Sequence, residues 1–167
     1  MKTFRAILLI IFIIASIANL GLSMFIQQQK VVNEQIATDN NLMLTNTSSC
    51  FVGNGGCATV QTSVYANTFG VSNPLIGVVV FFVLAIIFSL QLVSVWHQHL
   101  ASKLRKFGGL TGFSLSVILG AGCLFSLWLL FVQFFLLHTT CKFCLWVDGI
   151  MIGMAILYLI FKDLLLD

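Results

Sequence analysis

The stretch His138-Thr139-Thr140-Cys141-Lys142-Phe143-Cys144 joins two long apolar runs, which extend over about 110–137 and about 141–161. Only three residues lie between the runs, and so short a connection makes two helices antiparallel neighbours. The pair Cys141 and Cys144 therefore lies at a tight corner, at the beginning of the second helix.

The composition predicts a membrane protein. Of the 167 residues, 59% are hydrophobic and only 8% are charged, and the mean hydropathy is +1.07. A helix needs roughly 20 apolar residues to cross the hydrocarbon layer, and the sequence supplies such runs at about 4–26, 74–96, 110–137 and 141–161. We predict one all-α membrane domain, 1–167, built as a four-helix transmembrane bundle with connections at 27–73 and 97–109.

The basic residues predict the orientation of these helices. On one side of the bundle lie Lys2, Arg5, Lys103, Arg105, Lys106 and Lys162, whereas Lys30 and Lys142 fall on the other. Because basic residues in short loops favour the cytoplasm, we expect both termini there. The 27–73 loop would face the periplasm or exterior from a bacterial inner membrane, or the lumen from the endoplasmic reticulum. This topology accounts for the net charge of +3 and leaves no support for a nucleic-acid partner.

Most of the cysteines fall on the outer side, where disulfides persist. Cys50 and Cys57 enclose three glycines, which let a ring close and reopen without strain. Alone, this pair would fit a static disulfide equally well, but Cys141 and Cys144 on the same face favour a redox role. Cys123 lies within a span and is expected only to pack.

A zinc site made of both cysteine pairs is the chemical alternative. Six residues separate Cys50 from Cys57, more than the two to four that are usual between zinc ligands. An oxidising compartment also disfavours reduced thiolates. We therefore predict no metal site.

The outer segment 27–73 is expected to cover the cysteine corner. Its first part is polar without clear periodicity, so we expect little regular structure there. Apolar residues recur at helical spacing over 58–69, which predicts a short amphipathic helix along the membrane surface, ended by Gly70. Asn73 precedes Pro74 as a capping residue precedes a first-turn proline.

Four glycines within the third and fourth spans are expected to let the helix backbones approach closely: Gly120, Gly122, Gly149 and Gly153. Small residues at such spacing are typical of helix contacts in membranes. Packing is therefore the interpretation for all four.

The position of the Cys141-x-x-Cys144 pair predicts its chemistry. The thiolate is the reactive form of cysteine, and the unpaired N–H groups of a helix N-terminus favour it. Both thiols are expected in the first turn, with Lys142 nearby. One sulfur could exchange with the loop disulfide while the other faces the bundle. This arrangement suits electron transfer from a water-soluble dithiol to a lipid-soluble quinone.

Taken in order, these features resemble the vitamin K epoxide reductase family, in a single-domain form. The resemblance covers most of the chain and rests on a span, the loop cysteines, Ser63, Phe69-Gly70, Asn73-x-x-x-Gly77, two more spans and Cys141-x-x-Cys144. It implies a four-helix bundle around a quinone (ubiquinone, menaquinone or vitamin K), covered by the loop and the short helix.

The resemblance also implies roles for individual residues. Cys50 and Cys57 would accept electrons from a thioredoxin-like partner, and Cys57 would exchange with Cys141. Cys144 would face the quinone ring. Asn73 would hydrogen-bond a quinone oxygen, and Ser63 would help to shape the site.

The chain departs from the family pattern at Asp148, where vertebrate relatives carry a tyrosine that contacts the quinone. An acidic residue there is either a proton donor to the quinone or a residue solvated near the membrane edge. We expect no fused thioredoxin-like domain of the kind that many bacterial relatives carry, so the resemblance implies a separate thioredoxin-fold partner.

Three functions remain open at this stage. The first is quinone-linked disulfide formation in a partner protein. The second is reduction of vitamin K epoxide or vitamin K quinone, of which the missing tyrosine disfavours the epoxide reaction. The third is a non-enzymatic membrane scaffold held by disulfides that never cycle.

Overall fold

The computed structural model describes residues 2–39, 57, 60–61, 63–68, 70–96 and 108–166. Its long helices are α1 (Lys2–Asp39), α3 (Asn73–Trp96), α5 (Gly108–Phe131) and α6 (Lys142–Leu166). The smaller elements are the 3₁₀ turn η1 (Val64–Ala66), the strands β1 (Asn67–Thr68) and β2 (Val71–Ser72), and the π-helix η2 (Val132–Leu136). Four of the described helices are long and apolar enough to cross a membrane, which confirms the predicted fold class.

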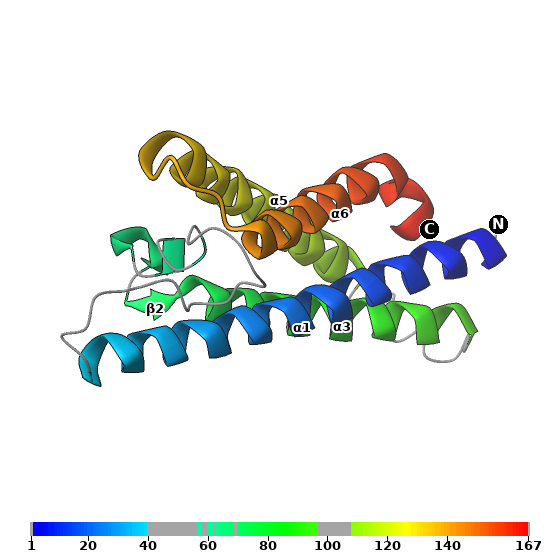
Figure 1. Cartoon of the computed structure of the whole chain (residues 1–167). Helices are drawn as coiled ribbons and strands as arrows, with labels where there is room; N and C mark the ends of the chain where they lie inside the picture. Colours follow the sequence, from blue (N-terminus) through cyan, green and yellow to red (C-terminus); the bar gives the residue numbers. More distant parts are fainter. Residues whose placement is uncertain are drawn as a thin grey trace.

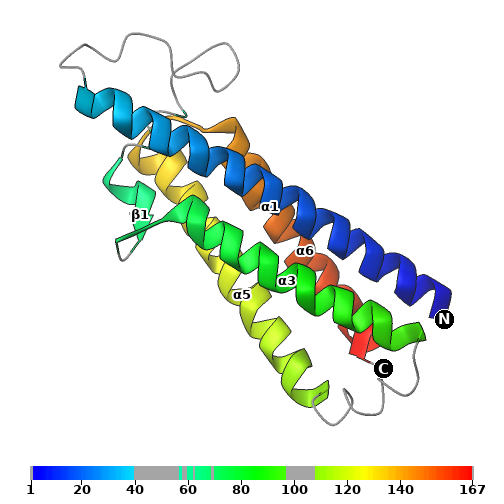
Figure 2. The same cartoon turned by 90° about the horizontal axis from the view of Figure 1, so that it is seen from below.

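The long helices form two crossing pairs. α1 packs along α3 and α5 along α6, and α1 also contacts α6, which joins the pairs (Figures 1 and 2). The two termini lie at the same end of the bundle (Figure 1), as an even number of spans requires. α3 and α5 make little close contact within the described residues.

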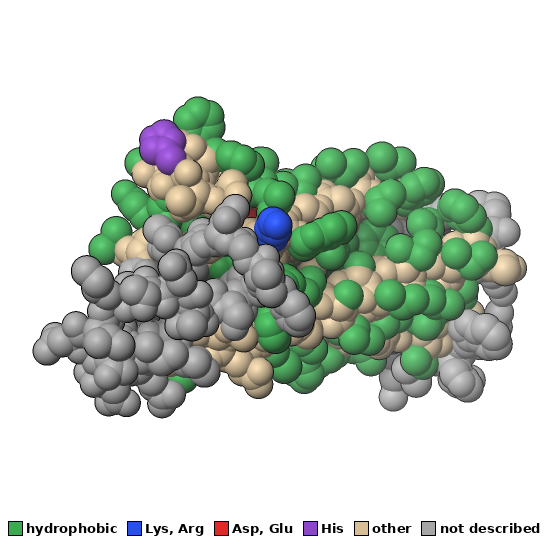
Figure 3. All heavy atoms as spheres, in the orientation of Figure 1, with side chains coloured by type: hydrophobic (Ala, Val, Ile, Leu, Met, Phe, Trp, Pro, Cys, Tyr) green, Lys and Arg blue, Asp and Glu red, His purple; other side chains and the backbone are tan. Residues whose placement is uncertain are grey.

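The hydrophobic core fills the half of the bundle near the termini. Leu9 and Phe12 of α1 meet Leu84 and Phe88 of α3 there, and the rings of Phe12 and Phe88 stack with centroids 4.8 Å apart. Cys123 packs against this core, as predicted. The outer faces of the helices are also apolar (Figure 3), and the side chains more than half exposed include Ile14, Phe113, Leu124 and Trp146. Such a surface is stable against lipid rather than water.

The first helix is longer than predicted. α1 continues to Asp39, whereas the loop was expected to begin at residue 27. The residues 27–30 are glutamines and a lysine, whose straight side chains lose little freedom in a helix. Their side chains also bind the segment that follows, as described below, so tertiary contacts support the extra turns.

The helix predicted over 58–69 is wrong in its second half. Cys57, Val60 and Gln61 are helical, but the chain then forms η1 and an antiparallel hairpin in which Asn67 pairs with Ser72 and Thr68 with Val71. We call this segment the β1–β2 hairpin. Gly70 has φ of +79°, a conformation that glycine adopts at little cost and that reverses the chain.

The glycine prediction holds for one position of the four. A Cβ at Gly122 would lie 1.9 Å from Met151 Cε, so α6 packs into the notch that Gly122 leaves in α5. At Gly120, Gly149 and Gly153 a Cβ would meet nothing within 4 Å among the described residues, so these three face away from the helix contact.

Candidate functional site

A cavity of about 130 Å³ lies in the half of the bundle away from the termini. All four long helices, η2 and residues between 60 and 66, before the β1–β2 hairpin, contribute to its lining, which is mainly apolar. An engineered protein cavity of about 150 Å³ binds benzene. The cavity is therefore slightly smaller than, but comparable in volume to, one that holds a six-membered ring.

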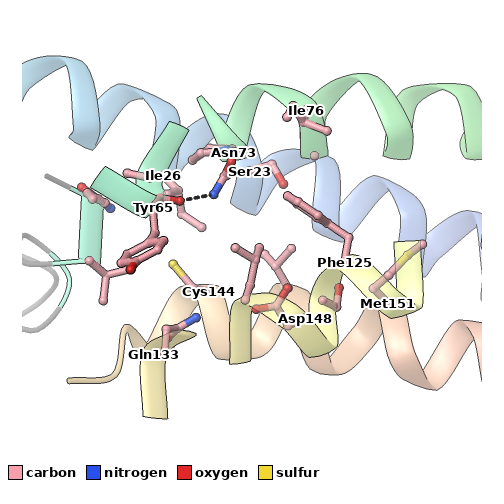
Figure 4. Close-up of a pocket in the computed structure, with 18 of the residues that line it drawn as sticks. Ser23, Ile26, Tyr65, Asn73, Ile76, Phe125, Gln133, Cys144, Asp148 and Met151 are labelled. Atoms are coloured by element: carbon pink, nitrogen blue, oxygen red, sulfur yellow. Dashed lines mark hydrogen bonds between the residues drawn. The ribbon is translucent and has the colours of Figure 1, made fainter. Parts of the chain in front are cut away.

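The two cysteines of the corner lie at this cavity in unequal positions. Their sulfurs are 2.7 Å apart and both are thiols. Cys141 is fully buried, whereas Cys144 lines the cavity (Figure 4). Because a disulfide has an S–S distance of about 2.05 Å, a small movement joins the sulfurs.

Cys141 caps the helix that it precedes. Its carbonyl accepts the first helical hydrogen bond from Leu145 at 2.9 Å, and its sulfur accepts the backbone N–H of Cys144 at 3.3 Å. A side-chain acceptor three residues before a free N–H is the geometry of an N-cap.

Cys57 lies close to Cys141. Its side chain is 4% exposed, and its sulfur hydrogen-bonds the thiol of Cys141. Cys141 thus contacts one sulfur from the outer segment and one at the cavity. Cys50 lies outside the described residues, as does Phe69.

The expectation that Cys141 gains thiolate character is wrong. The hydrogen bond with Cys144 raises the pKa of Cys141 from its ordinary value of 9.0 to about 12; the bond with Cys57 opposes this rise, and burial adds to it. The effect of the helix N-terminus is outweighed because Cys144 and the burial stabilise the neutral thiol.

Asn73 lies at the cavity, where α3 begins. Its Nδ2 donates to the carbonyl of Tyr65 at 2.8 Å, and its Oδ1 accepts the hydroxyl of Thr68 at 2.6 Å. Asn73 therefore fixes the hairpin as well as lining the cavity. Ser63 also lines it, and its hydroxyl donates to Val60 at 2.8 Å.

Asp148 lies on α6 one turn after Cys144 and faces the cavity (Figure 4). It is only 4% exposed, so the alternative of a residue solvated near the membrane edge is wrong. Ser126 of α5 lies close to its carboxyl group, and Oδ2 is buried without a hydrogen-bond partner among the described residues.

Gln133 and Ser126 belong to the site although no sequence motif pointed to them. Gln133 is buried, and its Oε1 accepts the backbone N–H of Cys141 at 3.1 Å. It lies in η2, where the wider helical turn alters the direction of side chains. The one available signal was a lone amide within an apolar run, since buried polar groups in spans are costly.

Lys30 was predicted only as a residue of the outer side, but it is 3% exposed and lines the cavity. Its Nζ donates to the carbonyl of Ala66 at 3.4 Å and to the side-chain oxygen of Asn67. Gln27, one turn earlier, accepts the hydroxyl of Ser72 at 2.6 Å. The extension of α1 thus holds both strands of the hairpin over the cavity.

Comparisons with curated proteins and with solved structures give no significant match. The sequence model described as "Vitamin K epoxide reductase family" matches residues 7–159, nearly the whole chain and every helix that lines the cavity. This multi-pass membrane protein therefore belongs to the vitamin K epoxide reductase family.

Proposed function

We propose that this protein is a quinone-linked thiol–disulfide oxidoreductase that forms disulfides in a separate thioredoxin-fold partner. One partner dithiol and one quinone give one partner disulfide and one quinol. The observation that carries the proposal is the position of Cys141, whose sulfur contacts Cys57 on one side and Cys144 on the other. Membership of the family supports an oxidoreductase that uses quinone or vitamin K.

The electrons move by thiol–disulfide exchange. The partner's dithiol reduces a Cys50–Cys57 disulfide. Cys57 then attacks the sulfur of Cys141 within a Cys141–Cys144 disulfide, forms a Cys57–Cys141 bond and releases Cys144. Cys50 attacks Cys57, which restores the loop disulfide and releases Cys141. The resulting dithiol of Cys141 and Cys144 gives two electrons and two protons to the quinone and becomes a disulfide again.

Burial explains why two pairs are needed. Cys141 has no exposed surface, and Cys57 has little, so a water-soluble partner cannot attack Cys141 directly. In the proposal Cys50 receives the partner, and Cys57 carries the electrons inward. The outer side is the periplasm of a bacterium or the lumen of the endoplasmic reticulum.

The cavity fits a quinone head group. Its volume is comparable to that of a cavity that holds one ring, and Asn73 and Asp148 lie on opposite sides of it (Figure 4), as the two oxygens of a para-quinone do. Cys144 lies beside Asp148 on α6.

Asp148 is a proton carrier in this proposal. It passes one of the two protons released by the thiols to the nearer quinone oxygen. Its position supports this role, because an acidic side chain buried at an apolar cavity within a membrane span is costly and is typical of a functional residue.

The test is oxidation of a reduced thioredoxin-fold protein by the purified enzyme with ubiquinone, menaquinone or vitamin K epoxide. We expect quinone-dependent oxidation that Cys144→Ala abolishes and Cys123→Ala leaves intact. Activity in the Cys144→Ala variant would refute the proposal. Preferred turnover of the epoxide would instead support a vitamin K cycle. Acid trapping should capture a Cys57–Cys141 bond, which a non-cycling scaffold would not form.

A further inference from the structure

Met151 lies where the cavity meets the hydrophobic core. Its side chain is 3% exposed, lines the cavity and belongs to the core cluster near the termini. Figure 4 shows Met151 at the opposite end of the site from Tyr65, with Cys144 and Asp148 between them. The side chain of Met151 therefore closes the inner end of the cavity.

The position of this side chain depends on a glycine of α5. A Cβ at Gly122 would lie 1.9 Å from Cε of Met151 and 3.4 Å from its Sδ, and Gly122 itself lines the cavity. The terminal methyl group thus rests against the backbone of α5 because residue 122 has no side chain. Between α5 and α6, the thioether of Met151 forms the wall at this end of the cavity.

The wall between α1 and α3 is built differently. A Cβ at Gly77 would lie 2.9 Å from Oγ of Ser23 and 3.9 Å from the ring of Phe81, and all three residues line the cavity. Ser23 is 2% exposed and Phe81 3%, so both are held by their neighbours. Methionine is unbranched and flexible. Met151 is therefore the side chain whose size and position can alter the space available to a ligand.

We propose that Met151 is a specificity-determining residue that limits the cavity to quinones with a single ring. The inference rests on the proposed function, since it takes the ligand to be a quinone, and it names the class of quinone. The cavity of about 130 Å³ is comparable to one of about 150 Å³ that binds benzene. A naphthoquinone carries a second, fused ring, and that ring needs the space that Met151 fills.

The first experiment measures binding and needs no turnover. The ligands are a benzoquinone and a naphthoquinone with the same short tail, both fully substituted on the quinone ring so that they do not add to thiols. The oxidised wild type should bind the benzoquinone about tenfold more tightly or better, because a hydrophobic pocket discriminates about 10–200-fold against even one extra methylene. Met151→Ala removes the inner wall and should abolish most of this preference by strengthening the binding of the naphthoquinone.

Met154→Ala is the matched control. Met154 is also on α6, is also 3% exposed and belongs to the same core cluster, but it is not among the residues that line the cavity. Its truncation should disturb the core as that of Met151 does, while the ratio of the two affinities stays unchanged. Met151→Val removes less volume, replaces the alanine variant if that variant does not fold, and should change the ratio in the same direction.

The second experiment measures turnover with a dithiol donor. Met151→Ala should raise kcat/KM for the naphthoquinone relative to the benzoquinone about tenfold, mainly through a lower KM for the naphthoquinone. Met154→Ala should leave this ratio as it is in the wild type.

The outcomes separate this inference from the proposed function. Equal affinities of the wild type for the two quinones, or the same change of ratio in Met151→Ala and Met154→Ala, would overturn the role of Met151 even in an active enzyme. If both quinones bind with the expected preference but neither is reduced, the proposed function fails while the role of Met151 stands. A protein that binds neither quinone would overturn both.

Discussion

Gln133 accepts the backbone N–H of Cys141 at 3.1 Å, across the corner between α5 and α6. A buried side chain of the π-helix η2 thus holds the residue on which both sulfur contacts converge. The side-chain amide of Gln133 holds the backbone of Cys141 and forms no hydrogen bond with its sulfur among those described.

Replacement of Gln133 should weaken this corner. Gln133→Leu leaves the buried N–H of Cys141 without its acceptor, and such a loss costs about 1–3 kcal/mol. We expect a lower free energy of unfolding in detergent and slower exchange between Cys57 and Cys141. Phe134→Leu is the control, since its side chain is half exposed. Equal stability of Gln133→Leu and the wild type would contradict the role assigned to Gln133.

The pH dependence of Cys141 follows from its neighbours. Its pKa of about 12 in the folded dithiol form lies above the ordinary 9.0. The folded reduced protein therefore gains stability from this thiol below pH of about 9 and loses it as the pH rises toward 12. Thermal unfolding of the reduced protein across this range should show the loss.

The Cys144→Ala variant tests the cause of that shift. It removes the hydrogen bond that contributes most to the raised pKa, so the thiolate of Cys141 should form at lower pH than in the wild type. The pH at which this thiolate forms can be measured by its ultraviolet absorbance in the Cys57→Ala/Cys123→Ala double variant. The same measurement is then made with Cys144→Ala added. An unchanged titration would show that Cys144 is not the cause.

Lys30 should stabilise the β1–β2 hairpin next to the cavity. Lys30→Met keeps most of the side-chain length but loses the bonds to Ala66 and Asn67. We expect faster amide exchange in the β1–β2 hairpin and a higher KM for quinone. Gln28→Met changes an exposed residue of the same helix and should have neither effect. If the rate of amide hydrogen exchange in the β1–β2 hairpin is unchanged in Lys30→Met, contacts other than those of Lys30 hold the hairpin in place.

Two glycines of α5 give a matched pair. Gly122→Ala places a Cβ where Met151 Cε now lies, and the flexible methionine can turn toward the cavity that it lines. We expect a small loss of stability but a higher KM for quinone, relieved by Met151→Ala. Gly120→Ala meets nothing within 4 Å and should be neutral or slightly stabilising. Equal KM values for both variants would contradict this account.

Much of the fold was predictable because its signals are local. Four apolar runs and a three-residue connection predict the bundle and the corner of Cys141 and Cys144 without knowledge of distant contacts. The helix over 58–69 failed because the turn at Gly70 and the bonds from Lys30 and Gln27 favour a hairpin. Those bonds join residues far apart in the chain.

The sequence pointed to Cys57, Cys141, Cys144 and Asp148, which the structure brings together, but not to the supporting residues; Cys50 lies outside the described residues. Cysteine spacing is visible in a sequence, whereas the position of Gln133 depends on a local π-helix. Ser126 is one serine among several in the spans, and only the packing of α5 on α6 brings it to Asp148. The depth at which Asp148 lies was likewise decided by the fold rather than by its place in the chain.

The sulfur of Cys141 has a second duty as the N-cap of α6. In the dithiol form this sulfur is a thiol that accepts the backbone N–H of Cys144, so in the proposed cycle the acceptor at the first turn of α6 becomes a disulfide sulfur each time the pair is oxidised. The backbone N–H of Cys144 should therefore report the oxidation state of the cysteine pair.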